Sequence, residues 1–265
     1  MKYLLLALIL CGSFVTLPTH ASDNASREVF SKGIGAFQKK EFSEASKLFA
    51  EVLREEPNNP SALYNWGLSL YQEGKVGQAL AAWRRSQALS PFSGETRKAL
   101  KFAKEHVSTA GFGDPDSEWE TFRSWLLVPV SFSLYATLTL VFLLIGGVPT
   151  LKYFAARKFA LLEDQPLPKT PLKGFFSLFL FSLFVILAIS KAYDLSVDRA
   201  TVVTEKVAVY TAPSSDDNQV FELLEGMEVF PLRTEGEWVQ ISSLGGLSGW
   251  IQKGHLYYTS GRQLW

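Results

Sequence analysis

The pattern of apolar and polar residues changes twice along the chain and divides it into three kinds of segment. Between about residues 25 and 107, apolar residues recur at helical spacing, which predicts packed amphipathic helices. Two uncharged apolar runs follow, Trp125–Gly147 and Gly174–Ser190, and each is typical of a membrane-spanning helix. From residue 200 onward, apolar and polar residues alternate between glycine-containing turns, which predicts short strands. The sequence therefore predicts a multi-domain membrane protein with an all-α region, two transmembrane helices and a C-terminal all-β barrel.

The helical region contains an internal repeat. Four residue types recur at one constant spacing, which we call the repeat period: Gly33 and Gly67, Ala45 and Ala79, Phe49 and Trp83, Pro57 and Pro91. The small residues would let paired helices approach closely, the aromatic residues would fill the space between them, and the prolines would end each unit. These residues and this period resemble the tetratricopeptide repeat, a helix–turn–helix unit that stacks into a solenoid. The resemblance implies two repeats and a capping helix within residues 22–108, and the alternative is a chance period in a pair of generic helical hairpins.

The same resemblance implies a partner-binding groove, because the first helix of each repeat lines the concave side of such a stack. By register, the candidate groove residues are Phe30, Ile34, Phe37, Tyr64, Asn65, Leu68 and Tyr71. Most of them would form an aromatic strip for a helix or an extended peptide, and Asn65 would hydrogen-bond a peptide backbone. The alternative is that the capping helix or the linker at residues 109–124 fills the groove.

The N-terminus, residues 1–21, is typical of a secretory signal peptide. Lys2 supplies a positive charge, residues 3–10 are apolar, and Thr19 and Ala21 are small residues at the positions that a signal peptidase reads. Lipidation of Cys11 is the alternative, although the large residue Leu10 precedes it. Cys11 is the only cysteine, so cleavage after Ala21 would leave a mature chain with no disulfide and no thiolate ligand.

The loop between the two apolar runs predicts their orientation. Residues 148–173 contain five basic and two acidic residues: Lys152, Arg157, Lys158, Lys169, Lys173, Glu163 and Asp164. The positive-inside rule then makes this loop cytoplasmic and places the domains on both sides of the spans outside the cytoplasm. A cleaved signal peptide requires the same location for the N-terminal domain. We therefore expect transmembrane helices at residues 125–147 and 174–193 of a bacterial inner membrane protein with periplasmic N- and C-terminal domains.

Two alternatives remain open for these segments. The apolar runs could instead be a pair of buried helices in a soluble domain. Within the loop, Leu151–Leu162 either lies along the inner membrane surface as a short amphipathic helix or extends the first span.

Residues 200–258 carry the landmarks of a second known domain. Four stretches follow one another as strands and turns do in bacterial SH3-like domains: Val207–Ser214, Leu224–Val229, Gly236–Ile241 and Gly249–Ile251. The resemblance implies a small all-β barrel that binds cell-wall peptides or protein partners, followed by a tail at residues 259–265. Its candidate ligand surface comprises Tyr210, Trp238, Trp250 and Tyr257. The alternative is a framework role, since large aromatic residues often cover a small core.

Composition and charge exclude several classes of function. The formal net charge is +0, with 26 basic and 26 acidic residues, so the chain lacks the electrostatic footprint of a nucleic-acid-binding protein. Its three histidines do not follow the spacing of a metal site, and no Walker-type glycine-rich loop occurs. We expect no cofactor, no metal and no catalytic residues, and therefore a binding protein rather than an enzyme.

The order of the segments resembles one family over nearly the whole chain. A signal peptide, tetratricopeptide repeats, two spans and an SH3-like (SH3b) domain also make up the BatE-type proteins of bacterial aerotolerance operons. The resemblance implies an inner-membrane scaffold whose partners are von Willebrand factor A-type Bat proteins and a MoxR-type ATPase system, with a role in oxidative-stress tolerance or envelope integrity. The alternative is a sensor or anchor that binds peptidoglycan through its SH3-like domain.

Overall fold

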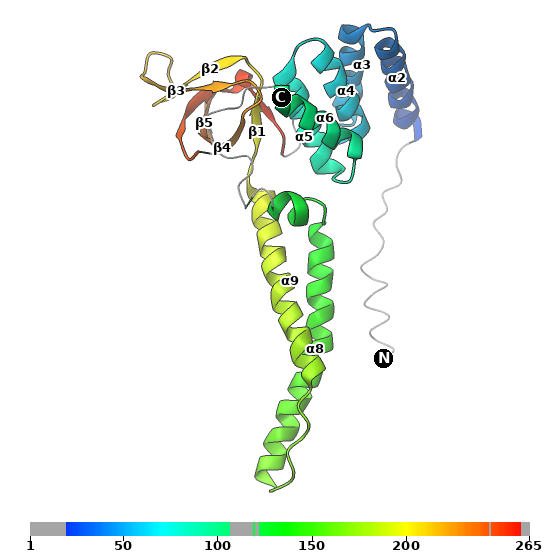
Figure 1. The fold of residues 1–265 in the computed structure, drawn as a ribbon, viewed down its shortest axis with the longest axis vertical. Coiled ribbons are helices and arrows are strands. Elements are labelled where there is room, and N and C mark those ends of the chain that lie inside the picture. The colour runs from blue at the N-terminus through cyan, green and yellow to red at the C-terminus, as the bar shows by residue number, and fades with distance from the viewer. Residues whose placement is uncertain (1–19, 107–118, 120–121, 244, 261–265) are drawn as a thin grey trace.

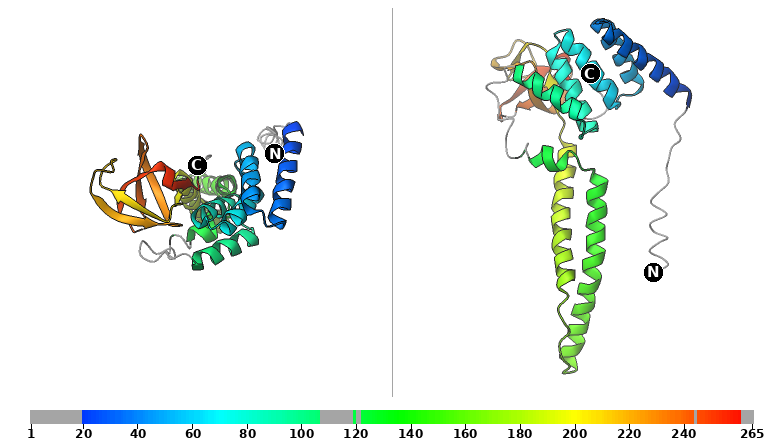
Figure 2. Two further views of the ribbon diagram at one scale, coloured as in Figure 1. Left: turned by 90° about the horizontal axis from the view of Figure 1, so that it is seen from above. Right: turned by 45° about the vertical axis from the view of Figure 1, so that its right-hand side comes forward.

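The computed structural model describes residues 20–106, 119, 122–243 and 245–260, which form a helical domain, a long helical hairpin and a β-sheet domain (Figure 1). The helical domain and the sheet domain lie at one end of the hairpin, and the other end projects away from both (Figures 1 and 2). We call the first end the body end. Apart from His20 and Ala21, which begin the first helix, the predicted signal peptide lies outside the described residues, as do most of the linker at 109–124 and most of the tail.

The helices of the helical domain recur at a fixed spacing. Among the described residues they are α2 (His20–Gln38), α3 (Phe42–Glu55), α4 (Pro60–Gln72), α5 (Val76–Leu89) and α6 (Gly94–His106). Helix α5 begins and ends one repeat period after α3 (42 to 76, 55 to 89), and α6 begins and ends one repeat period after α4 (60 to 94, 72 to 106). The start of α4 follows from its sequence, because the Asn59 side chain accepts a hydrogen bond from the Ala62 amide and Pro60 occupies the first helical position.

A close glycine–aromatic contact occurs in both helix pairs. A Cβ atom on Gly33 would lie 2.9 Å from the Phe49 ring, and a Cβ atom on Gly67 would lie 2.4 Å from the Trp83 ring. Neither position therefore accommodates a larger residue without moving a fully buried ring. The indole of Trp83 is fixed further because its Nε1 donates a hydrogen bond of 3.0 Å to the Tyr64 carbonyl. The repeat period thus applies to packing contacts as well as to helix ends.

The hairpin consists of two helices, α8 (Phe132–Leu162) and α9 (Leu172–Ser196), and the short π-helix η1 (Arg123–Leu127) precedes it. Both long helices are long and apolar enough to cross a membrane. They approach closely where small residues meet, since a Cβ atom on Gly146 would lie 2.8 Å from the Gly174 carbonyl oxygen. Ser177 also donates a hydrogen bond of 2.9 Å to the Phe142 carbonyl across the pair.

The first long helix begins and ends later than the sequence suggested. We expected a span at residues 125–147, whereas η1 ends at Leu127 and α8 runs from Phe132 to Leu162. Pro129, which cannot donate a backbone hydrogen bond, lies in the break, and the Ser131 side chain caps α8 by accepting from the Leu134 amide. Of the two alternatives for residues 151–162, the structure shows the extension, because α8 continues through them as one helix.

The sheet domain contains strands β1 (Ala200–Val202), β2 (Lys206–Tyr210), β3 (Gln219–Leu224), β4 (Glu228–Glu235), β5 (Trp238–Ser243), β6 (Ser248–Gln252) and β7 (Leu256–Tyr258), with the short 3-10 helix η2 (Lys253–His255) before β7. In the described residues the strands form one antiparallel sheet in the order β3-β2-β6-β5-β4-β1-β7. The expected alternation is visible on β5, where Val239 and Ile241 are fully buried and Trp238 and Gln240 are half-buried. The apolar face of the sheet therefore encloses its own core.

Two short polar contacts join the sheet domain to the helical domain. The Gly77 amide donates a hydrogen bond of 2.6 Å to Oε1 of Glu225, and Arg84 Nη1 donates one of 2.6 Å to Oγ1 of Thr201. Gly77 is the second residue of α5, so its amide has no partner within the helix and lies at the positive end of the helix dipole. The carboxylate of Glu225 satisfies that amide, and the contact holds the two domains together through α5.

The body end of the hairpin is joined to the sheet domain through buried charges. Asp194 on α9 accepts from Arg123 Nε at 2.5 Å and lies 3.5 Å from Nη2 of Arg199, which directly precedes β1. Lys191, one turn earlier on α9, donates a hydrogen bond of 2.8 Å to the Leu127 carbonyl at the end of η1. These contacts connect α9 to η1 on one side and to the first strand on the other.

Candidate ligand-binding site

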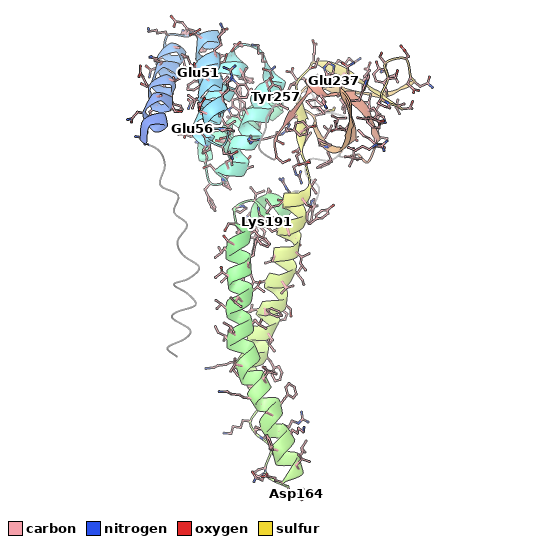
Figure 3. All side chains as sticks on the ribbon, turned by 180° about the vertical axis from the view of Figure 1, so that it is seen from behind. Glu51, Glu56, Asp164, Lys191, Glu237 and Tyr257 are labelled. Carbon is pink, nitrogen blue, oxygen red and sulfur yellow. The ribbon has the colours of Figure 1, made fainter. Side chains whose placement is uncertain are left out.

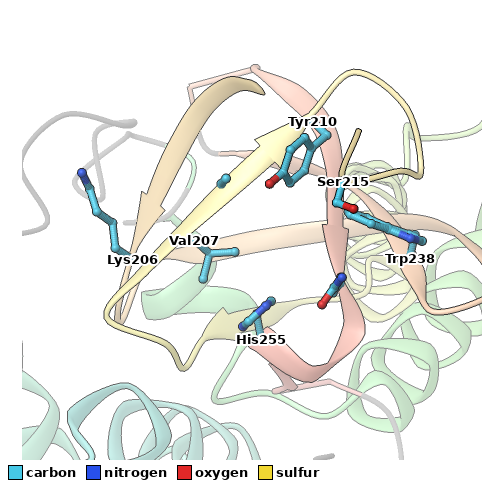
Figure 4. A pocket seen from close by; sticks show the side chains of 8 residues that line it. Lys206, Val207, Tyr210, Ser215, Trp238 and His255 are labelled. Atoms are coloured by element: carbon cyan, nitrogen blue, oxygen red, sulfur yellow. The ribbon is translucent and has the colours of Figure 1, made fainter. Parts of the chain in front are cut away.

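A cavity of about 170 Å³ lies on the sheet domain (Figure 4). It is lined by Lys206, Val207, Ala208, Tyr210, Ser215, Trp238, Gln252 and His255. Strand β2 supplies the first four of these residues. The antiparallel register places Trp238 at the start of β5 opposite Gln252 at the end of β6, so residues that are distant in sequence meet at this cavity.

An aromatic pair forms one wall of the cavity. The rings of Tyr210 and Trp238 lie 5.6 Å apart at 90°, which is an edge-to-face arrangement. Tyr210 ends β2, and the pairing with β3 shifts register between Val209 and Tyr210; such a bulge turns a side chain away from the regular pleat. Both rings are half-buried, so each keeps surface that a ligand could contact.

Polar groups form the rest of the lining. Lys206 pairs with Glu222 on the neighbouring strand, and the hydrogen bond from Lys206 lowers the pKa of that carboxyl group. His255 Nδ1 lies 2.9 Å from Oγ1 of Thr204, which fixes the orientation of the imidazole ring. With the amide of Gln252, these groups offer hydrogen-bond donors to a ligand that carries carbonyl or carboxylate oxygens. Among the residues that the structure describes, no group of three or more His, Cys, Asp or Glu side chains could hold a metal ion.

The loop between β2 and β3 carries Ser215 to the cavity. Its conformation is set by short-range hydrogen bonds, because Asp217 accepts from the Thr211 hydroxyl at 2.8 Å and from the Asn218 amide at 2.9 Å. These two bonds lower the pKa of Asp217, so the carboxylate that shapes the loop stays ionised at neutral pH. Hydrogen bonds between the loop's own residues therefore set its conformation.

Two of the four predicted ligand residues of this domain line the cavity, and two lie elsewhere. Tyr210 and Trp238 form the aromatic wall described above. Trp250 is 3% exposed and lies beneath the Arg233 guanidinium, whose carbon is 4.9 Å from the ring centre, so its position is that of a framework residue.

Tyr257 lies at the contact between the two domains. Its ring stacks on Trp66 of α4, with 6.2 Å between ring centres and an angle of 12° between ring planes. Figure 3 shows Tyr257 where the sheet domain meets the helical domain. Its ring is therefore already engaged by the chain itself.

The sequence did not single out four polar residues that line the cavity: Lys206, Ser215, Gln252 and His255. None of them stands in a motif, and they meet only because β2, the loop after it, the end of β6 and η2 come together in the fold. The pairing of Trp238 with Gln252 depends on the register of β5 against β6, which the turn residues alone do not determine.

The predicted groove residues of the helical domain all lie half-buried on α2 and α4: Phe30, Ile34, Phe37, Tyr64, Asn65, Leu68 and Tyr71. Part of their surface serves the core, as the edge contact of Phe30 with Phe49 shows. The capping helix α6 reaches one of them, because Phe102 contacts Tyr71 with 5.8 Å between ring centres. The Asn65 amide donates a hydrogen bond to Ser61 in its own helix. A partner-binding role for these residues stays a prediction.

Comparison with known proteins identifies one part of the chain. The family model of the bacterial SH3 domain matches residues 205–257, which run from β2 into β7 and contain every residue that lines the cavity. A search of curated proteins finds no match to the chain. The prediction of an SH3-like domain is therefore confirmed for this segment: residues 205–257 form a bacterial SH3 domain, and the candidate site belongs to it.

Proposed function

We propose that this protein is a membrane-anchored adaptor that binds a peptide segment of a protein partner in the cavity of its SH3 domain. The observation that carries the proposal is the cavity itself, where the Tyr210–Trp238 pair stands beside polar donors within the matched domain. A bound peptide would place an apolar or aromatic side chain against the pair and direct its carbonyl or carboxylate oxygens toward Lys206 and Gln252. The proposed role is binding and not catalysis.

The helical domain would provide a second partner site. The helix bounds that recur after one repeat period, and the matching contacts of Gly33 with Phe49 and Gly67 with Trp83, support a tetratricopeptide solenoid of two repeats with α6 as its capping helix. In that fold the predicted residues on α2 and α4 would face the groove. Because α5 contacts the SH3 domain through Gly77, the two sites would keep a fixed relative position.

The hairpin would anchor both domains to the bacterial inner membrane. Only 17% of the most apolar stretch of each long helix is buried, whereas the core helix of a soluble protein is mostly buried. Helices whose apolar stretches are this exposed are suited to lipid, where every backbone polar group is satisfied within the helix. The excess of basic residues in 148–173 would place that segment in the cytoplasm and the two domains in the periplasm.

Within this arrangement we place the protein in a Bat-type complex. The order of its segments supports a BatE-like scaffold whose partners are von Willebrand factor A-type Bat proteins and a MoxR-type ATPase system, with a role in oxidative-stress tolerance or envelope integrity. A second candidate is a peptidoglycan-binding sensor or anchor. It is favoured by the cationic and amide groups of the cavity, which would also suit the carboxylates of a cell-wall stem peptide.

Affinity purification of the tagged full-length protein in mild detergent, followed by mass spectrometry, tests the proposal. We expect a membrane or periplasmic protein to co-purify with the wild type and to be lost from the variant Trp238→Ala. The matched control is Val220→Ala, since Val220 is 50% exposed on β3 and lies outside the cavity lining. Recovery of von Willebrand factor A-type proteins would support the Bat-type placement.

The same variants separate the two candidates. If purified cell-wall material retains the wild type but not Trp238→Ala, and no protein depends on Trp238, the cell-wall function replaces the adaptor function. If neither protein recovery nor cell-wall retention changes in Trp238→Ala, the cavity is not the binding site and both candidates fail.

A further inference from the structure

The far end of the hairpin extends beyond the paired helices. Helix α9 begins level with the middle of α8, because Gly174 lies against Gly146 and Thr150. Helix α8 nevertheless continues to Leu162, and the connection to α9 runs back beside it (Figure 1). The backbone amide of Gln165 donates a hydrogen bond of 2.9 Å to the Ala160 carbonyl at this turn. We call residues 151–172 the distal stalk.

The length of α8 places the end of the distal stalk beyond a lipid bilayer, if the hairpin crosses the membrane as proposed above. A helix of 31 residues is about 46 Å long, whereas the hydrocarbon core of a bilayer is about 30 Å thick and needs about 20 residues. Counted from Phe132, the hydrocarbon core ends near Leu151. Leu162 then lies about 16 Å further out, and the headgroup layer on one side accounts for only about 5–7 Å of that distance.

The distal stalk exposes large apolar side chains where it should meet water. Leu161 and Leu162, at the end that should meet water, are 63% and 71% exposed, and Phe154, which by the same count lies at the headgroup layer, is 51% exposed. These three residues line a shallow groove on one face of α8 together with Arg157 and Lys158. Their spacing of three, four, seven and eight residues from Phe154 keeps all five on the same side of the helix. The groove thus has apolar ends and two cationic side chains between them.

Topology explains the charges of this groove but not its apolar residues. The positive-inside rule accounts for basic residues next to a span, and it makes no demand for exposed leucine or phenylalanine. Large exposed apolar side chains that cluster beside polar groups often mark an interaction site in a soluble environment. Among the ion pairs of the described residues, none involves Arg157 or Lys158, so both cations are available to a partner.

We propose that the groove formed by Phe154, Arg157, Lys158, Leu161 and Leu162 docks an acidic amphipathic helix of a protein partner. The apolar positions of that helix pack against Phe154 and the two leucines, and its carboxylates face the two cations. Anionic lipid has complementary charge, but the two leucines stand beyond the headgroup layer while α8 remains one continuous helix. The proposal rests on the membrane anchor and does not depend on the ligand of the SH3 domain.

A peptide of defined chemistry tests this proposal. The full-length protein is placed in phosphatidylcholine nanodiscs and titrated with a fluorescent helical peptide that carries leucine at helical spacing and glutamate on the flanks. We expect saturable binding, and binding at least about tenfold weaker for the charge reversal Arg157→Glu with Lys158→Glu and for Leu161→Ser. A peptide with lysine in place of glutamate should not bind.

The matched control changes the same net charge outside the groove. Lys169→Glu with Lys173→Glu removes two exposed cations from the same region, and it should leave peptide affinity nearly unchanged. Equal losses of peptide affinity in both double variants would mean that net charge alone attracts the peptide, and this would overturn the proposed docking groove. Failure of the wild type to bind the peptide, or equal binding of the lysine peptide, also overturns it.

A dye on the distal stalk separates protein docking from lipid docking. Leu162→Cys in a Cys11→Ser background gives one attachment site, because Cys11 is the only native cysteine. We expect the same dye emission in phosphatidylcholine and phosphatidylglycerol nanodiscs. A blue shift confined to phosphatidylglycerol would show that the stalk lies on anionic lipid and would overturn the proposal. Failure to enter nanodiscs would instead contradict the membrane anchor itself, and the dependence of partner recovery on Trp238 would remain a separate result.

Discussion

The two ends of the helical hairpin differ in how their charged side chains are placed. At the body end, charged groups are buried and paired: the Asp194 side chain is 6% exposed and lies between Arg123 and Arg199. At the distal stalk, charged groups face solvent, and Leu161 and Leu162 are exposed beside them. Figure 3 shows this separation, with Lys191 near the body and Asp164 at the far tip. The chain thus pairs its own charged groups at the body end, whereas the cations of the distal stalk stay available to the proposed partner.

The body end also shows how a span can be coupled to a folded domain. Arg199 lies near Asp194 of α9 and 3.9 Å from Glu228 of β4, and its guanidinium carbon is 5.1 Å from the Phe230 ring centre. One side chain therefore links the end of α9 to the sheet, and only three residues (197–199) separate α9 from β1. A tilt or rotation of α9 would move the sheet with it rather than bend a free linker.

The largest effect in this comparison is expected from Asp194→Ala. The substitution leaves the two arginines near Asp194 without their shared carboxylate in a buried position, and the loss of one partner of such a pair costs about 3–5 kcal/mol. Chemical denaturation of the full-length protein in detergent measures it. Glu163→Ala, which removes an exposed carboxylate at the distal stalk, should change stability by less than about 0.5 kcal/mol. Equal effects of the two substitutions would remove the difference between the ends.

A smaller effect is expected where the two domains meet. In Gly77→Ala the new Cβ atom would lie 2.5 Å from Cγ of Glu225 and 2.7 Å from the Val202 carbonyl oxygen, so the domains would have to separate slightly. We expect a loss of about 1–3 kcal/mol and faster proteolysis between the domains. Gly94→Ala is the control, because it makes the same change at the start of α6 and its Cβ would meet nothing within 4 Å. If both variants behave alike, the contact through α5 does not hold the domains together.

The sequence predicted the type of each segment better than its ends. Helical spacing, apolar runs and alternation each report on local contacts, so they predicted the helical region, the two apolar helices and the β-domain. The ends of α8 were set instead by the break at Pro129 and by the continuation through Pro149, which a search for apolar residues does not detect. The uncharged run ends where the lipid would end, while the helix itself continues into the polar loop.

The candidate site was only half predictable for a related reason. Tyr210 and Trp238 stand next to recognisable turns, so their exposure at the end of a strand could be expected. Tyr257 has the same residue type and a similar setting, but its ring stacks on Trp66 of the other domain. Contacts between domains depend on how two finished surfaces fit, and no periodicity within either domain encodes that fit.

The stability contributed by the contact of Tyr257 with the helical domain should depend on pH. Burial raises the pKa of the Tyr257 hydroxyl above the ordinary value of 10.0, and nearby Lys75 opposes this in part. The folded state therefore holds the proton more tightly than the unfolded state, so the contribution to stability is complete below about pH 10 and is lost as pH rises through the folded pKa. Burial raises the pKa of Tyr258 as well, so part of the alkaline loss belongs to that residue.

Denaturation at a series of pH values checks this expectation. Between about pH 8 and a pH above about 10, Tyr257→Phe should lose less stability than the wild type, because one buried hydroxyl no longer ionises. An unchanged alkaline slope in Tyr257→Phe would show that the ring does not stay buried against Trp66 in solution.

The smallest effect on stability is expected from the distal stalk, and that small effect is itself informative. The double variant Arg157→Glu with Lys158→Glu, and separately Leu161→Ser, should each change the free energy of unfolding by less than about 0.5 kcal/mol. All three side chains are exposed, and neither cation takes part in the ion pairs of the described residues. The same denaturation series measures them. A loss comparable to that of Asp194→Ala would mean that the stalk packs within the chain after all. Unchanged stability together with weaker binding of the acidic peptide would separate the two properties, as expected of a surface whose contacts lie in a partner.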